Sequence, residues 1–484
     1  MSRAPRLLIA ALAVGLTVPS FLLSAPTSVA AVGCHAANHV AGDLDSDGLA
    51  DVVVGVPSYD GDRGAIDILY SNGERRFVRA TDLGLTSLQG DRFGESIALG
   101  DLNSDGCADL AIGAPGRNSS AGVAYLVRSD GNRNLTLINL FNGTAPHGSF
   151  GAQVLMLAGR QLVVSAPTAD DGSRWEAGQL QVLPLTTSGA LAGPRVKLTQ
   201  SSPGVPGVSE NGDRFGTRLA GQDRTIVVGT PNEAVGTRTD AGSVTLLSAS
   251  AAKPLAYSGI AVSQDTTGVP GTAESGDQFG AAVAFRDHYV LVGVPGETIG
   301  SARWTGQVHV LNFDPATRRV RSLRAVSQDT AGIPGANESG DYFGSSVALG
   351  INTWDQLTAI VGAPGEAIGR VLGAGTVTMF RANRTGGLAT SVRQGAGGIP
   401  GVPESGDHFG WSVGVLTGDL DDGEAMTDGL VIGAPGEDIG GTEDAGSVTY
   451  SRSADTWYTL LLEDTGDDIP AGAQFGEATA QVAA

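Results

Sequence analysis

The chain has 484 residues, a formal net charge of −21 and 72 glycines. An acidic balance of this size argues against nucleic acid and anionic membrane surfaces as partners, because both are recognised through basic patches. The length exceeds what one ordinary core can bury, so we expect a core assembled from repeats, and the glycines show no Gly-X-Y period that would indicate a collagen-like helix.

The N-terminus has the features of a targeting segment. Arg3 and Arg6 precede the mostly apolar run Leu7–Leu23, and Ser28–Ala30 offers a small-x-small cleavage site. This pattern predicts a secretory signal peptide at residues 1–30. No other stretch reaches membrane-spanning length, so we expect a soluble, secreted, extracellular chain without membrane insertion.

Two cysteines, Cys34 and Cys107, are the whole cysteine content. An even count in an exported chain predicts one disulfide between them. The alternative is a lipidated Cys34, because Ala31–Cys34 loosely resembles a lipoprotein processing box.

Two short motifs recur along the chain. Seven Phe-Gly pairs are spaced by 57 to 66 residues, and they begin at Phe93, Phe150, Phe215, Phe279, Phe343, Phe409 and Phe475. Seven Gly/Ser-x-Pro triplets alternate with them and end at Pro57, Pro115, Pro167, Pro231, Pro295, Pro364 and Pro435. A fixed period of this size indicates a stacked or radial array of supersecondary units.

Each unit has the pattern of four short strands. In the second unit these are Glu95–Leu102, Ala108–Pro115, Gly122–Ser129 and Leu135–Leu140. Helical periodicity is absent, and turns rich in Gly, Asp and Asn separate the runs. The second strand of each unit is almost continuously apolar, which indicates burial on both faces, as between the blades of a propeller.

The sequence therefore predicts an all-β fold: a single seven-bladed β-propeller with four antiparallel strands per blade, spanning residues 31–484. The expected blades are residues 34–85, 90–140, 147–200, 211–260, 275–325, 339–390 and 405–463, with 471–484 as a closing segment. The Phe of each pair is expected to wedge between blades, and its Gly to allow close backbone approach. The first unit lacks a preceding Phe-Gly, so we expect Phe475 to return to it and close the ring.

The segment Arg92–Gly116, RFGESIALGDLNSDGCADLAIGAPG, and its six partial copies resemble the FG-GAP repeats of integrin alpha-chain propellers and their bacterial relatives. The resemblance covers nearly all of the chain after residue 30. It implies a seven-bladed propeller, calcium in some of its loops, and a role in extracellular binding or adhesion.

Two acidic loops have oxygen-bearing residues at alternating positions and a Gly at the sixth position, a spacing that suits Ca²⁺. The expected ligands are Asp43, Asp45, Asp47, Asp51 and the Leu49 carbonyl in the first loop, and Asp101, Asn103, Asp105, Asp109 and the Cys107 carbonyl in the second. The alternative is an acidic turn without metal. A third loop, with Asp419, Asp421 and Asp428, departs from the spacing, and whether it binds Ca²⁺ is left open.

A second acidic set recurs in three units, before the Phe and after the Gly-x-Pro, and includes Glu274, Asp277, Glu297, Glu338, Asp341, Glu366, Glu404, Asp407 and Glu437. Its repetition favours a structural role in turns over a ring of weak cation contacts.

Catalytic motifs are not evident. Gly410–Gly414 matches G-x-S-x-G, but Ser412 falls within a predicted strand, whereas that motif requires a strand–turn–helix. We therefore expect no enzyme activity. The predicted function is a monomeric, secreted, calcium-binding module for an extracellular protein or glycan. The alternative is an exported hydrolase of phospholipid or carbohydrate, a class that FG-GAP repeats accompany.

Overall fold

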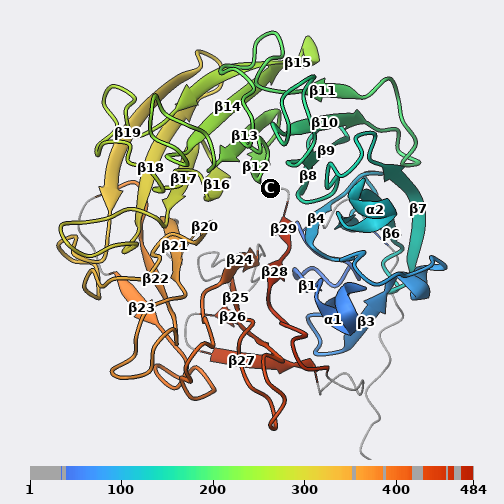
Figure 1. Ribbon diagram of the computed structural model, residues 1–484. Coiled ribbons are helices and arrows are strands. Elements are labelled where there is room, and N and C mark those ends of the chain that lie inside the picture. Colours follow the sequence, from blue (N-terminus) through green and yellow to red (C-terminus); the bar gives the residue numbers. More distant parts are fainter. Residues whose placement is uncertain are drawn as a thin grey trace, which may run out of the picture.

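The computed structural model describes residue 34 and residues 40–351, 356–384, 389–416, 429–453, 456–462 and 470–482. In these residues nearly all regular structure is β-strand, arranged as seven sheets around a central axis (Figure 1). The helical segments there are the four-residue turns α1 (Tyr59–Asp62), α2 (Arg117–Ser120) and the 3-10 turn η2 (Ala80–Leu83). The predicted all-β, seven-bladed propeller is confirmed. Across the same residues, no helix is long and apolar enough to cross a bilayer.

The seven blades follow the chain in order, with the innermost strand named first. Blade 1 contains β28 (Ala478–Thr479), β1 (Val52–Val56), β2 (Ala65–Leu69) and β3 (Arg75–Arg79). Blade 2 contains β29 (Gln481–Val482), β4 (Ser96–Gly100), β5 (Asp109–Ala114), β6 (Val123–Ser129) and β7 (Leu135–Asn142). Blade 3 contains β8 (Val154–Leu157), β9 (Gln161–Ala166), β10 (Gln179–Pro184) and β11 (Val196–Leu198).

Blades 4 to 7 repeat the same plan. Blade 4 contains β12 (Arg218–Gln222), β13 (Thr225–Thr230), β14 (Ser243–Ser250) and β15 (Lys253–Val262). Blade 5 contains β16 (Ala282–Arg286), β17 (Tyr289–Val294), β18 (Gln307–Asp314) and β19 (Arg319–Val326). Blade 6 contains β20 (Ser346–Ile351), β21 (Leu357–Ala363), β22 (Thr376–Arg381) and β23 (Thr390–Val392). Blade 7 contains β24 (Ser412–Leu416), β25 (Gly429–Ala434), β26 (Ser447–Ser453) and β27 (Thr456–Leu461).

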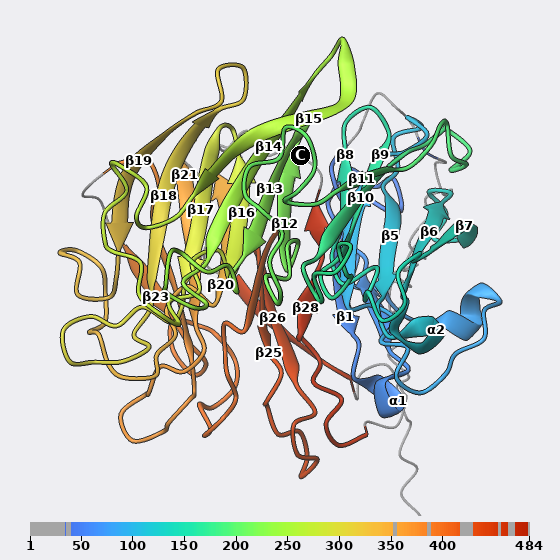
Figure 2. The same ribbon diagram turned by 45° about the horizontal axis from the view of Figure 1, so that its top comes forward.

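The near-continuous apolar runs occupy the second position of each blade. Every residue of β5, β9 and β13 is buried. Strands of neighbouring blades lie side by side around the axis (Figure 2), so these strands are covered on both faces by the adjacent blades. This burial explains why they do not alternate between apolar and polar residues.

The Phe-Gly pairs lie at the interfaces between blades. All seven phenylalanines are at most 1% exposed. Phe343, for example, packs with Val308 of blade 5 and Val361 of blade 6 in one apolar cluster. Gly293, the glycine of a Gly-x-Pro triplet, lies against the next blade so closely that a Cβ there would be 2.0 Å from the carbonyl oxygen of Gly344. The repeated motif is therefore an interface motif, as predicted.

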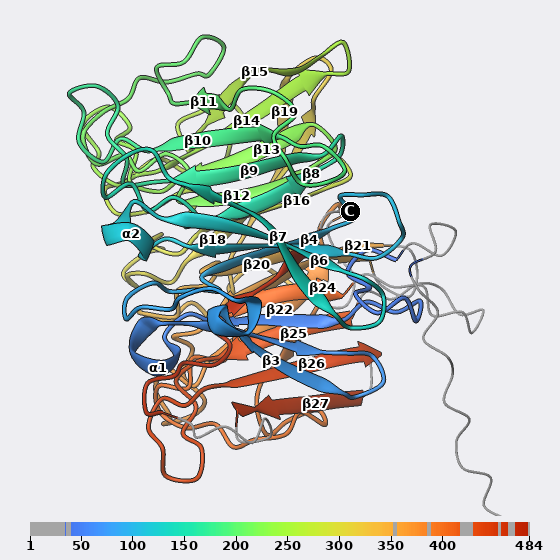
Figure 3. The same cartoon turned by 90° about the vertical axis from the view of Figure 1, so that its right-hand side faces the viewer.

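The C-terminal segment closes the ring. The chain of the first blade supplies three strands, and β28 pairs antiparallel with β1 to supply the fourth. Phe475 is fully buried among Val54 of blade 1 and Val431 of blade 7. The chain then adds β29 to blade 2 as a fifth strand, parallel to β4. This fifth strand is an addition to the predicted four antiparallel strands of blade 2. Figure 3 shows the propeller from the side, with α1 and α2 at the same end of the molecule.

The two cysteines form a disulfide. Cys34 and Cys107 are bonded with a Cα–Cα distance of 5.3 Å. The predicted disulfide is confirmed, and it leaves no free thiol on Cys34 for lipidation. It ties the segment before blade 1 to the loop between β4 and β5 of blade 2.

Replacing Phe475 by Ala should lower the midpoint of thermal unfolding, because it empties the interface that closes the ring. A buried Phe→Ala change costs about 3–5 kcal/mol. Ending the chain at Pro470, which also removes β28 and β29, should lower the midpoint further. Scanning calorimetry measures both.

The control is Trp175→Ala, which removes an aromatic ring that is 55% exposed and should change stability by less than about 0.5 kcal/mol. Equal midpoints for Phe475→Ala and this control would contradict ring closure through Phe475.

Candidate functional site

The two acidic loops adopt the same turn. The first precedes β1, and the second joins β4 to β5. Asp43 accepts hydrogen bonds from the backbone N–H groups of Ser46 (2.6 Å) and Gly48 (2.9 Å). Asp101 accepts the corresponding bonds from Ser104 (2.7 Å) and Gly106 (3.0 Å). The glycines have φ angles of 90° and 99°, which explains why Gly stands at the sixth position of each loop.

The first loop brings three carboxylates together. Asp43, Asp45 and Asp51 are buried, and one ligand-competent oxygen of each lies within 4.8 Å of the others. Asp51 Oδ2 accepts a bond from the Leu44 N–H at 2.8 Å. Asp45 Oδ1 is buried without a hydrogen-bond partner. Asp47, in contrast, is exposed and accepts a bond from the Leu49 N–H at 3.0 Å.

Burial and mutual repulsion act on these carboxyl groups. Burial raises the pKa of Asp43 and of Asp45, and raises that of Asp51 well above its ordinary value. Arg133, from the turn between β6 and β7, pairs with Asp45 Oδ2 at 2.7 Å and so neutralises one side of the cluster. The other side presents oxygens only, which are the ligands that Ca²⁺ prefers. The residues of the first loop therefore fit a hard divalent cation.

The second loop is arranged differently. Asp105 accepts hydrogen bonds from the Asn103 side chain (2.6 Å) and from the Cys107 N–H (3.0 Å). Its oxygens are therefore used in hydrogen bonds within the loop. Asp109 is fully buried, burial raises its pKa to about 7, and its Oδ1 has no hydrogen-bond partner. Asp101, Asp105 and Asp109 do not form a three-carboxylate cluster in the described structure. Asp105 lies instead beside Cys34 and Cys107, whose sulfurs are in the disulfide.

The third candidate loop lies outside the described residues. Asp419, Asp421 and Asp428 fall within 417–428, so the prediction for this loop stays a prediction.

Ser412 has a structural role. It begins β24, and its hydroxyl donates to the carbonyl of Gly476 at 2.7 Å. Ser96 and Ser346 make the same bond to Gly151 and Gly410 of the next blade. These serines fasten one blade to the next, as expected for a strand residue in a repeat.

The second acidic set is built into the blade interfaces. Asp277 Oδ2 accepts a bond from the Glu274 N–H at 2.6 Å, which confirms the predicted turn role. Glu297 accepts instead from the side-chain amide of Gln264, also at 2.6 Å. Analogous Gln–Glu pairs are Gln200–Glu233, Gln328–Glu366 and Gln394–Glu437. Sequence reasoning missed the glutamines, although each precedes the turn Asp of its unit by 13 residues.

The stability of the fold should therefore fall as the pH rises. Burial raises the pKa of Glu297 to about 7 and that of Asp277 to about 6. A carboxyl group with a raised pKa in the folded state contributes stability that is present below its unfolded pKa and is lost as the pH rises through the folded value. We expect Glu297→Gln to keep the bond to Gln264 and to unfold at a higher temperature than the wild type at pH 8, but not at pH 5.

The measurement is the unfolding midpoint between pH 5 and pH 8, with the exposed Glu443→Gln as the control for loss of one charge. If Glu297→Gln and Glu443→Gln depended on pH alike, the titration of Glu297 in the folded state would be excluded.

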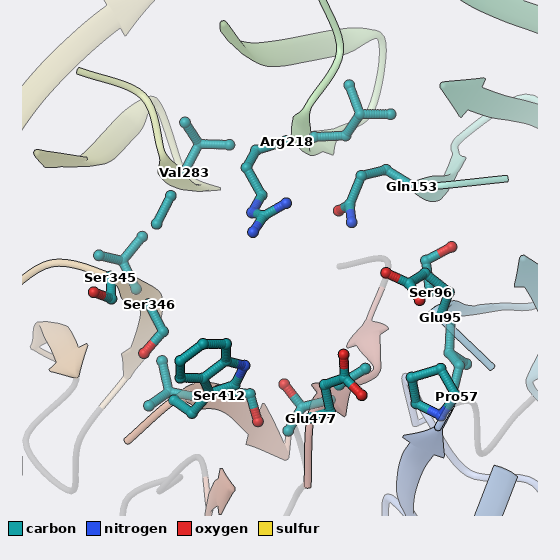
Figure 4. A pocket seen from close by; sticks show the side chains of 18 of the residues that line it. Pro57, Glu95, Ser96, Gln153, Arg218, Val283, Ser345, Ser346, Ser412 and Glu477 are labelled. Atoms are coloured by element: carbon teal, nitrogen blue, oxygen red, sulfur yellow. The ribbon is translucent and has the colours of Figure 1, made fainter. Parts of the chain in front are cut away.

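A cavity lies on the axis, at the end of the innermost strands opposite the acidic loops. Its volume is about 270 Å³, and residues that directly follow the Phe-Gly pairs line it. Glu95, Gln153, Arg218 and Glu477 come from different blades and surround a common space (Figure 4). Trp411, which is 48% exposed, lines the same cavity. Sequence reasoning missed this cavity, because it joins residues from all seven units.

Comparison with known proteins identifies the repeat. The chain matches the FG-GAP repeat family over residues 40–69 and 93–127, the two units that carry the acidic loops. It is similar to integrin alpha-PS5 of Drosophila melanogaster (37% identity over 122 residues) and to integrin alpha-6 of Homo sapiens (36% over 77 residues). These matches cover 24% and 15% of this chain, and only 12% and 7% of the relatives' own lengths.

Solved structures of similar architecture include a functionally unknown protein from Desulfotomaculum acetoxidans, with 11% identity, a TM-score of 0.46, and coverage of 89% of this chain and 99% of that chain. Another is the periplasmic gluconolactonase of Pseudomonas aeruginosa, with 14% identity, a TM-score of 0.43, and coverage of 85% and 99%. At these values the likeness says nothing about activity.

Proposed function

Because the chain is an integrin-alpha-like FG-GAP repeat propeller, we propose that it is a secreted, calcium-binding module that binds an extracellular protein or glycan and has no catalytic activity. The observation that carries the calcium proposal is the buried cluster of Asp43, Asp45 and Asp51, in which Asp45 Oδ1 has no hydrogen-bond partner. An unpaired carboxylate oxygen is costly to bury unless a cation binds it.

The cation would stabilise the contact between the first two blades. Arg133 already links Asp45 to blade 2, and the Ala108 N–H donates to the carbonyl of Asp43 at 2.7 Å. Ca²⁺ at this loop supplies the positive charge that three clustered carboxylates lack. The second loop, with Asn103 and Asp105 bonded to each other, is the weaker candidate.

Two features support a binding role: the structural use of Ser412 and the exposed aromatic side chains near the cavity. Ser412, the residue of the nucleophile-like string, is used in a bond between blades. Exposed aromatic side chains lie on the loops around the cavity end: Trp304 stacks on Tyr342 with ring centroids 6.3 Å apart, and both are partly exposed. Such rings are common in recognition surfaces because they combine apolar area with low conformational entropy.

Calcium should bind with measurable heat and should raise the unfolding temperature. Calcium at 100 times its Kd would stabilise the fold by about 2.7 kcal/mol. Asp45→Asn should abolish most of this effect, because it removes a charged ligand, while Asp109→Asn reports on the second loop. Isothermal titration and scanning calorimetry in Ca²⁺ and in Mg²⁺ measure both quantities.

The control is Asp223→Asn, an exposed Asp that is remote from both loops in the sequence. Unchanged binding heat in Asp45→Asn would reject the first loop as the site. Reproducible turnover of ester, phosphodiester or glycoside substrates by the purified chain would reject the non-catalytic role.

A further inference from the structure

Arg218 is a charged side chain at a position of the repeat that is uncharged in the other six units. It stands at the third position after its Phe, where Ser96, Ser346 and Ser412 each fasten their blade to a glycine carbonyl of the next. The other three units have Gln153, Ala282 and Ala478 at this position, so Arg218 is the one charged residue among the seven. A single charged residue at an otherwise uncharged position of a repeat is the kind of local departure that is expected at functional sites.

The guanidinium of Arg218 is left available to a ligand. Its side chain points into the cavity (Figure 4) and donates to the carbonyl of Thr217 at 3.0 Å. Within the described part of the chain, no carboxylate lies within ion-pair distance of it. Gln153, from the neighbouring blade 3, adds an amide beside it.

Another part of the cavity wall carries two carboxylates, and both are held in place by ion pairs within the protein. Arg92 holds two carboxylates in place, Glu95 at 2.6 Å and Glu477 at 2.9 Å. Ser58 donates a further hydrogen bond to Glu477 at 2.9 Å. These oxygens can accept hydrogen bonds from hydroxyl groups but would repel a second anion. The cavity is therefore bipolar, with a cation on one side and hydrogen-bond acceptors on the other.

We propose that this cavity binds a single carboxylated sugar residue. The carboxylate pairs with Arg218, because guanidinium and carboxylate match in a two-bond geometry. The sugar hydroxyls donate to Glu95 and Glu477, and one face of the ring lies against Trp411. The volume of about 270 Å³ is close to the lower end of ligand pockets, about 300 Å³, which suits one sugar ring rather than a chain. This inference rests on the proposed binding function and narrows its glycan partner to one with an acidic terminal residue.

The test titrates the purified full chain, in calcium, with glucuronate, galacturonate and N-acetylneuraminate, and with neutral glucose as the matched ligand control. We expect at least one acid to bind and glucose to bind at least about tenfold more weakly, since a hydrogen-bonded charge contributes about 1.5–3 kcal/mol. Arg218→Ser should weaken binding of the acid by at least about tenfold and, if the new serine bonds to the Gly280 carbonyl as Ser96 bonds to that of Gly151, should raise the unfolding temperature.

Arg319→Ser, at an exposed arginine of β19, is the matched control and should leave binding unchanged. Equal binding of the acid by wild type and Arg218→Ser, or no binding of any acid, overturns the proposal. Calcium titration of the same proteins separates this failure from that of the proposed function: the acidic loops lie at the other end of the innermost strands, so Arg218→Ser should keep its calcium response.

Discussion

A close backbone contact between blades is the constraint on which the rest of the structure depends. At six interfaces the glycine of one blade lies against the carbonyl of the Phe-Gly glycine in the next, where any Cβ would be about 2 Å from that oxygen. The seventh, between blades 3 and 4, has Ser165 at this position. Because the backbones approach so closely, each Phe is enclosed on all sides, and its burial stabilises the interface. The motif therefore repeats because the geometry repeats.

This contact lies near the cavity end of each blade, as at Gly113, which pairs with Ser96, the first residue of β4. In β4, Ser96 lies at the cavity end, and the acidic loop begins after Gly100 at the other end. Residues at the two ends contact different surroundings, so a substitution at one end need not disturb the other. Stability is concentrated between the ends, in the buried strands such as β5. The chain thus separates the residues that assemble the ring from those available for recognition.

The fold was predictable because its signals are local and recur seven times. The Phe-Gly spacing, the apolar runs and the Asp spacing each lie within one unit, and so does the turn role of Asp277. The features that could not be predicted are contacts between residues that are remote in sequence. The ion pair between Arg133 and Asp45 spans 88 residues, and the cavity gathers side chains from every blade. The partner of Gln264 lies 33 residues away, so the regular position of Gln was visible but its role was not.

The carboxylates of the blade interfaces and those of the first loop differ in a way that bears on where a cation belongs. At the blade interfaces, half-buried Glu297 has an amide donor in Gln264, and burial raises its pKa to about 7, which favours the neutral acid below that pH. In the first loop, Asp43, Asp45 and Asp51 face one another, and no side-chain amide reaches the unpaired oxygen of Asp45. A cation shared by the three carboxylates would give that oxygen a partner and offset the repulsion among the three charges. The proposal therefore places calcium at the first loop and leaves the more numerous interface carboxylates to hold the ring together.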